Sequence, residues 1–456
     1  MKKAIFLVED IVFNREIYAS GKKFAKRPVT LLEKFWSIHL SHDRSLESMA
    51  YITNVIDSGD SDYIEFQPVN TFINDVDNSN QLPPDRNVYY FISSWLEIGN
   101  FHLTNLLLID QHVRKFLVKH DIPIIIDSTM ETGSVYQDVY NIFQDKYYLL
   151  QERSAWNDIL KLKFYTVFGG IRKNTNNYQF DMNVNVRYFP CSFFHTHYKN
   201  SEGYHSTHNY FDKNPGPDPF NMTWGALCRK PSITRVMFQI NAELSKLTKF
   251  GRYSRIYPCQ DFYLTHYSRY ELNKLGYEKG YYKFLDQLVY LDDYEKVKEY
   301  YYDENIVNDM YIDYQRFTKN FKPMIQVVIE TCLINCYKEF FESPTQLSEK
   351  SVLPIISKRP FIPIGGYLLG KILKKIGFVD YRTFEFSNNK FFPDDLDYVK
   401  NNLVKLNMLT ESEKNSLYAE WQETAEYNYN YFFNLDIKKL YLEFLNIDMK
   451  DWFKHE

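Results

Sequence analysis

Short apolar runs that end in a polar or glycine-containing turn recur along this chain, and they limit its fold more than any other feature. Four of them are PIIIDSTMETG, KLKFYTVFGG, FKPMIQVVIET and the start of IPIGGYLLGKILKKIGF. Runs this apolar are typical of strands that are buried on both faces of a parallel sheet. Amphipathic stretches such as LTNLLLIDQHVRKFLVKH lie between them and favour covering helices. The alternation predicts an α/β protein.

The length of the chain, 456 residues, predicts more than one core. AIFLVED and NVYYFISSW add two candidate strands near the N-terminus, and residues 200–219 form a polar stretch rich in Gly, Pro and Asn. We therefore expect an N-terminal lobe over 1–220, a second sheet-containing lobe over 221–400 and helices over 401–456. Whether those helices cross back to the first lobe stays open.

The composition sets limits on function. The chain is 45% hydrophobic and 25% charged with a formal net charge of −4, which fits a soluble globular protein and does not indicate a general nucleic-acid binder. Its five cysteines form no CxxC pair, and an odd number suits a reducing compartment. No run of ~20 apolar residues occurs, so we expect no membrane span and a cytoplasmic location.

A basic turn, LCRKPSITR, follows the candidate strand that begins at Met222. The stretch 222–257 holds seven basic residues and one acidic residue. Arg229 and Lys230 would stand where a strand ends and a helix begins, a place where free backbone N–H groups and the helix dipole attract anions. A solvated basic helix face explains the same residues about equally well.

A second turn of this kind lies in QLSEKSVLPII. Ser348 can cap a helix that begins at Glu349, whose carboxylate can accept two hydrogen bonds from a ribose diol, while Lys350 can reach a diphosphate. A capped surface helix is the simpler explanation of this segment alone. Two basic strand-to-helix turns in one lobe, however, are what a nucleotide diphosphate requires, and this pairing favours a binding site.

VVIET, LSEKSVLPIISKRPFIPIGG and LKKIGF together resemble the donor-binding lobe of GT-B-type glycosyltransferases. The resemblance is to phage-encoded sugar transferases and, more remotely, to α-1,3-fucosyltransferases, and it covers roughly residues 222–378. LCRKPSITRVMFQINAEL, followed by GRYSR, is similar to the arginine-bearing turn and helix that open such lobes. The resemblance implies two Rossmann-like lobes with a helical C-terminal tail, and transfer of a sugar from a nucleotide sugar.

The resemblance also implies residue roles. Glu349 would hold the ribose, Lys350 the diphosphate and Arg229 or Arg235 the same phosphates, with Glu330 in support at the end of its strand. Gly365 and Gly366 would border the sugar or the base, although a simple tight turn explains them equally well. After Phe378 the sequence VDYRTFEFSNNKFF departs from the family pattern, so the sugar is not assigned.

Transfer to a hydroxyl needs a base, and the candidates are Asp127 and Glu131, because IIIDSTMETG leaves the carboxyl end of a strand. Glu97 and His102 are next, and a capping or exposed carboxylate is the alternative for each acid. We expect no required metal ion and no resident cofactor, because cations and a helix N-terminus can stabilise the diphosphate. The acidic pairs in GDSD, at residues 60 and 62, and in DDLD, at 394–397, are interpreted as surface loops, and the histidines of residues 195–208 as part of a loop over the cleft.

The predicted function is therefore sugar transfer from a UDP- or GDP-linked donor. The acceptor could be a hydroxymethylated base in phage DNA, a glycan or a protein. The alternative is a non-catalytic protein that keeps this fold as a binding or assembly module. The sequence predicts no membrane partner and gives no oligomeric state.

Overall fold

The computed structural model forms two compact units, one over 1–196 with 436–456 and one over 197–435. The residues that it describes are 2–13, 27–29, 61–93, 106, 108–129, 158–169, 183–190, 219–226, 233–253, 322–330, 347, 349–365, 369–386 and 392–447. Several predicted site residues lie outside this set: Glu97, His102, Glu131, Arg229, Ser348, Gly366 and the histidines of 195–208.

The first unit is built on a sheet in which every described pair of strands is parallel except β1 with β2. The spatial order is β2-β1-β4-β5-β6-β7, and β3 also pairs with β1. The strands are β1 (Lys3–Phe13), β2 (Arg27–Val29), β3 (Ile64–Pro68), β4 (Arg86–Ser93), β5 (Ile124–Ser128), β6 (Phe164–Phe168) and β7 (Val184–Tyr188). Ile124, Ile125 and Ile126 are all fully buried, as expected for a strand covered on both faces.

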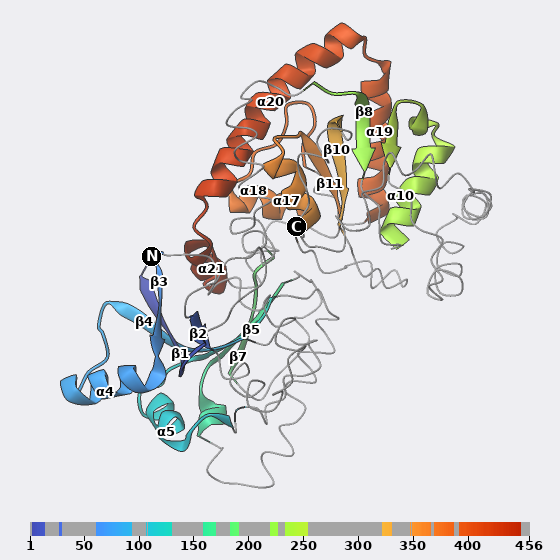
Figure 1. Ribbon diagram of the computed structural model, residues 1–456. Helices are drawn as coiled ribbons and strands as arrows, with labels where there is room; N and C mark the ends of the chain where they lie inside the picture. The colour runs from blue at the N-terminus through green and yellow to red at the C-terminus, as the bar shows by residue number, and fades with distance from the viewer. Residues whose placement is uncertain are drawn as a thin grey trace. The chain divides into compact units, whose positions relative to one another are not determined.

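Helices α4 (Val69–Ser79), α5 (Gln111–Lys119) and α21 (Ile437–Leu445) belong to this unit, with a 3₁₀ turn over Ile159–Lys161. Helix α21 comes from the end of the described chain and packs on the sheet at β3 and β7 (Figure 1). The Tyr441 ring lies 6.1 Å from that of Phe6 and 5.0 Å from that of Phe189. Arg187 Nε donates a hydrogen bond to the Leu445 carbonyl over 2.8 Å. The C-terminal helix therefore completes the core of the first unit.

The second unit has a sheet of parallel strands in the order β11-β10-β8-β9. These strands are β8 (Met222–Ala226), β9 (Gly251–Tyr253), β10 (Pro323–Ile329) and β11 (Phe361–Ile364). The helices are α10 (Ile233–Leu244), α17 (Glu349–Ile356), α18 (Leu369–Ile376), α19 (Phe392–Met408) and α20 (Glu411–Asn434), with a 3₁₀ turn over Leu247–Lys249. Helix α10 packs with α19, and α17 packs with α20 (Figure 1).

The structure confirms the predicted α/β class, and strands occur in all the apolar runs quoted above. The interpretation of residues 394–397 as a surface loop is wrong, because they lie in the first turns of α19. Pro393 is tolerated in a first turn, and aspartates there complement the helix dipole. Asp395 is buried at 3% exposure, so it belongs to the packing of the unit. In the part of the chain that the structure describes, no helix is both long and apolar enough to cross a membrane.

Candidate functional site

The sheet of the second unit changes direction between β8 and β10. The chain leaves β8 through α10 towards β9, and leaves β10 through α17 towards β11 on the other side. Because such crossovers are right-handed in nearly all proteins, we expect α10 and α17 to cover opposite faces, which makes the carboxyl ends of β8 and β10 a topological switch point. Ligands of open α/β sheets bind in the crevice at such a point. This edge is the candidate functional site.

A buried carboxylate lies at this edge. Glu330 directly follows β10 and is 2% exposed, and its Oε1 accepts a hydrogen bond of 2.5 Å from the hydroxyl of Ser351. Ser351 is the third residue of α17 and is fully buried. The backbone N–H of Glu330 also donates to the Ile364 carbonyl of β11 over 2.9 Å. These bonds hold the start of α17 against the carboxyl ends of β10 and β11.

The predicted donor-binding residues flank the same edge. Glu349 and Lys350 are the first two residues of α17, and the structure describes the backbone of both. Arg229 falls in the segment 227–232. This segment connects Ala226, the last residue of β8, to Ile233, the first residue of α10. Since β8 and β10 are parallel neighbours, both strand-to-helix connections leave the sheet at one edge.

Two further predicted residues are described in full. Arg235 is the third residue of α10 and is 1% exposed, so its side chain lies inside the unit rather than on a solvated basic face. Gly365 directly follows β11 and is buried. Both residues stand at the edge that carries Glu330, because every described strand pair of this sheet is parallel. The predicted donor-binding residues thus belong to the ends of three neighbouring strands, β8, β10 and β11. Each residue either follows one of these strands or stands in the first turn of the helix that comes after it.

The sheet of the first unit has its own change of direction, between β1 and β4, since β3 lies on one side of β1 and β4 to β7 follow on the other. Glu9 is the seventh residue of β1, just beyond the part that pairs with β3 and β4, and is 7% exposed. Its Oε1 accepts a hydrogen bond of 2.8 Å from the hydroxyl of Tyr90, which is fully buried. Sequence reasoning missed Glu9; the signal was an acid that ends the apolar run AIFLVED.

Asp127, the predicted base, is the fourth residue of β5 and is buried at 6% exposure. Its Oδ1 accepts hydrogen bonds from the Thr129 hydroxyl, at 2.8 Å, and from the Thr129 backbone N–H, at 3.1 Å. The Tyr441 hydroxyl of α21 also interacts with this carboxylate, but its geometry is not that of a regular hydrogen bond. Desolvation outweighs these interactions and raises the pKa of Asp127, as suits a general base.

Glu9 and Asp127, the buried acids among the described residues of the first unit, lie on opposite faces of its sheet. Leu7 pairs with Tyr90 and Tyr90 with Ile124, so Glu9 stands level with Ile92, whereas Asp127 pairs with Ser93. Successive side chains of a strand alternate between faces, and this register separates the two carboxylates by one position.

Among the described residues, no group of three or more His, Cys, Asp and Glu side chains is placed to hold a metal ion. Asp62 of the GDSD pair is exposed and forms a 3.9 Å ion pair with Lys3, and Asp60 lies outside the described residues.

Comparisons with known proteins identify no family for this chain. The sequence matches no protein-family model and no curated protein sequence. Among solved structures, a glycosyltransferase from Rickettsia africae ESF-5 is similar to this chain over the full length of both chains, with a TM-score of 0.27 and 14% sequence identity. A similarity at this level carries no assignment of fold or function.

Proposed function

We propose that this protein is a glycosyltransferase that transfers a sugar from a UDP- or GDP-linked donor to an acceptor hydroxyl. One observation carries the proposal: the connection that holds Arg229 and the helix start that holds Lys350 follow two neighbouring parallel strands, at the edge where the second sheet changes direction. The resemblance of residues 222–378 to a donor-binding lobe predicts a nucleotide site in these same connections.

In this proposal the donor is held by the edge that carries Glu330. Arg229 and Lys350 neutralise the diphosphate as the bond between the anomeric carbon and the phosphate oxygen breaks, and Glu349 binds the ribose. Arg235 is 1% exposed in the first turn of α10, so direct contact with the phosphates is assigned to Arg229 and Lys350 alone. The Glu330–Ser351 hydrogen bond keeps the start of α17 in place, so that its N–H groups face the anion. These groups need no metal ion to stabilise the leaving diphosphate.

The second half of the reaction is assigned to the first unit. The acceptor oxygen forms the new bond to the anomeric carbon, and its proton passes to the Asp127 carboxylate. Burial favours the neutral form of this group, so the protonated state that follows transfer is stabilised. The acceptor proposed first is a hydroxymethylated base of phage DNA in the host cytoplasm, and a glycan or a protein hydroxyl are the alternatives for the assay.

The test begins with a thermal-shift screen against UDP, GDP and their sugars, because a ligand that binds the folded state raises its melting temperature. Mass spectrometry then follows donor hydrolysis and transfer by the wild type, by Lys350→Ala and by Lys375→Ala. Lys375 is exposed in the last turn of α18 in the same unit and serves as the matched control.

Loss of turnover in Lys350→Ala alone supports the assignment. Equal turnover in all three proteins overturns the donor site. Nucleotide binding without hydrolysis or transfer to any acceptor favours a non-catalytic binding module, and absence of binding removes the proposal.

A further inference from the structure

The two oxygens of the Asp127 carboxylate have different surroundings. Oδ1 accepts a hydrogen bond of 2.8 Å from the Thr129 hydroxyl and one of 3.1 Å from the Thr129 backbone N–H. Within the part of the chain that the structure describes, the regular hydrogen bonds of this carboxylate all end on Oδ1. Oδ2 is therefore the oxygen that keeps its lone pairs for another donor.

Thr129 is well placed to fix the direction of the carboxylate. It directly follows β5 and is 2% exposed. The strand before it is held on both sides, because Asp127 pairs with Ser93 of β4 and with Val167 of β6. Both donors to Oδ1 belong to this one buried residue, and one of them is main chain. The carboxylate therefore cannot turn about its Cβ–Cγ bond without breaking hydrogen bonds to atoms that the sheet holds in place.

The same bonds act on the charge of the group. Burial raises the pKa of Asp127, and the bonds from Thr129 act in the opposite direction because they stabilise the ionised carboxylate. A general base has to be ionised before it accepts a proton, and its oxygen has to lie within hydrogen-bond reach of that proton. Hydrogen bonds at Oδ1 serve both requirements and leave the second oxygen available.

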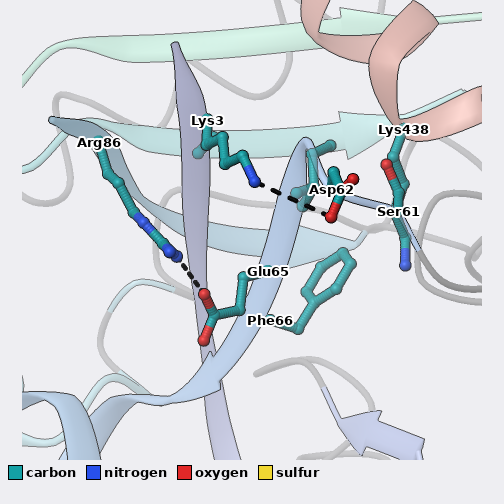
Figure 2. A pocket seen from close by; sticks show the side chains of 9 residues that line it. Lys3, Ser61, Asp62, Glu65, Phe66, Arg86 and Lys438 are labelled. Atoms are coloured by element: carbon teal, nitrogen blue, oxygen red, sulfur yellow. Dashed lines mark hydrogen bonds and ion pairs between the residues drawn. The ribbon is translucent and has the colours of Figure 1, made fainter.

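Other titratable or charged side chains share this face of the sheet. Those that the structure describes on the neighbouring strands and on α21 include Tyr89, Lys163, Tyr165, Arg187, Lys438 and Tyr441. Lys163 Nζ and Arg187 Cζ lie 4.7 and 5.6 Å from the centre of the Tyr165 ring. Lys438 Nζ lies 5.4 Å from the centre of the Phe66 ring, and Figure 2 shows the two side chains. Each of these cations thus contacts an aromatic ring.

The pKa of Asp127 depends on burial, on Thr129 and on Tyr441. The Tyr441 ring contacts Phe6 and Phe189, and burial raises the pKa of its hydroxyl well above the usual value, so the phenol stays protonated at neutral pH. Its hydroxyl does not form a regular hydrogen bond with the carboxylate. Thr129 is therefore the residue whose hydrogen bonds orient Asp127.

We propose that Thr129 is a positioning residue for the proposed base: it holds Oδ1 of Asp127, so that Oδ2 receives the proton of the acceptor hydroxyl. This role rests on the proposed function and deepens it. The acceptor oxygen bonds to the anomeric carbon through a lone pair, and its proton goes to Oδ2. The nucleoside diphosphate leaves with the electron pair of the broken bond between the anomeric carbon and the phosphate oxygen.

Three substitutions in the full chain test this role. Thr129→Val removes the hydroxyl and keeps the shape of the side chain and the backbone N–H, and Thr129→Ser keeps the hydroxyl. Thr166→Val is the matched control, because Thr166 is fully buried on β6, beside β5. It pairs with Ile126, so it lies on the face opposite to Asp127, and among the described residues its hydroxyl has no hydrogen-bond partner.

The first measurement is the pH dependence of turnover, with the UDP- or GDP-linked sugar that the wild type turns over fastest. Thr129→Val is expected to lower the turnover number about tenfold, the effect of losing one hydrogen bond to an ionised group, with KM for the donor unchanged. The acidic limb of its pH profile should move to higher pH, because the ionised base has lost a donor. Thr129→Ser should restore both properties, and Thr166→Val should behave as the wild type.

The second measurement does not depend on turnover. Urea unfolding across the pH range compares Asp127→Asn with its parent, once in the wild type and once in Thr129→Val. In both backgrounds the gain of Asp127→Asn levels off once the pH passes the pKa of Asp127 in the folded chain. Without the Thr129 hydroxyl this pKa is higher, so the gain should continue to higher pH. Thr129→Ala provides the same comparison if Thr129→Val does not fold.

The outcomes separate the two proposals. A wild type that neither hydrolyses nor transfers any donor sugar overturns the proposed function, and the role of Thr129 with it. An active wild type whose turnover number and pH profile are unchanged in Thr129→Val overturns the role of Thr129 alone, even if the urea measurements shift, since Thr129 then acts only on folding. An equal loss of turnover in Thr166→Val also overturns it.

Discussion

The hydroxyl of Ser351 donates a hydrogen bond to Oε1 of Glu330, and both side chains are buried in the second unit. This bond joins the first turn of α17 to the end of β10. It couples the position of the helix start, where Glu349 and Lys350 stand, to the sheet that orients it.

Ser351→Ala is expected to lower the free energy of unfolding by about 1–3 kcal/mol, because a buried carboxylate loses one of its hydrogen-bond donors. Ser357→Ala removes a 3.2 Å bond to the Pro354 carbonyl in the same region and should cost less, about 0.5–1.5 kcal/mol. Urea unfolding of both variants measures the difference. Equal losses would show that the Glu330 bond has no special weight.

Asp127 predicts a pH dependence of stability. Burial raises its pKa, so between the pKa of the unfolded chain and that of the folded chain the folded state binds more protons. The stability that Asp127 contributes is therefore complete below the unfolded pKa and is lost as the pH rises through the folded pKa. Asp127→Asn removes this term, and its free energy of unfolding should gain on the wild type as the pH rises above about 4, the pKa of an aspartate in the unfolded chain. Parallel curves from urea unfolding would contradict the shift.

Substitution of Asp127 also tests the proposed catalytic step. Asp127→Asn is expected to lower the turnover number about 10²-fold or more, the usual effect of losing a general base, with binding of free nucleotide unchanged. Glu9→Gln alters a second buried acid of this sheet, on its opposite face, and should keep turnover within a few-fold of the wild type. A larger loss in Glu9→Gln than in Asp127→Asn would move the base to β1.

Asp436 fastens α21 to the first unit. It caps the helix at the Lys439 N–H over 2.9 Å and accepts the Ser61 hydroxyl, so Asp436→Ala should cost about 1–2 kcal/mol of stability. Asp436→Ser keeps a capping oxygen and is expected to recover part of this loss. Thermal unfolding distinguishes the two variants, and identical melting temperatures would assign the whole effect to the bond with Ser61.

Seven strands were predicted from sequence because they are apolar along their length, as in residues 124–128 and 323–329. Strands β3 and β7, most of whose residues are partly exposed, and the three-residue strands β2 and β9 were missed. Helix α4 was missed, although Val69, Phe72, Ile73 and Val76 have helical spacing, because its other positions are largely Asn, Asp, Thr and Ser. The Glu330–Ser351 bond could not be predicted, since it joins residues whose proximity depends on how α17 packs against β10.

The first unit is discontinuous in sequence: its last described helix, α21, follows the whole of the second unit. On the ribosome, the surface of the sheet that Tyr441 covers must wait until residues 436–445 have emerged, after all of the intervening chain. The second unit has its complete sequence first and can fold during synthesis. The environment of Asp127 is thus finished as one of the last events in the maturation of the protein, and a premature stop before α21 would remove the Tyr441 side chain from that carboxylate.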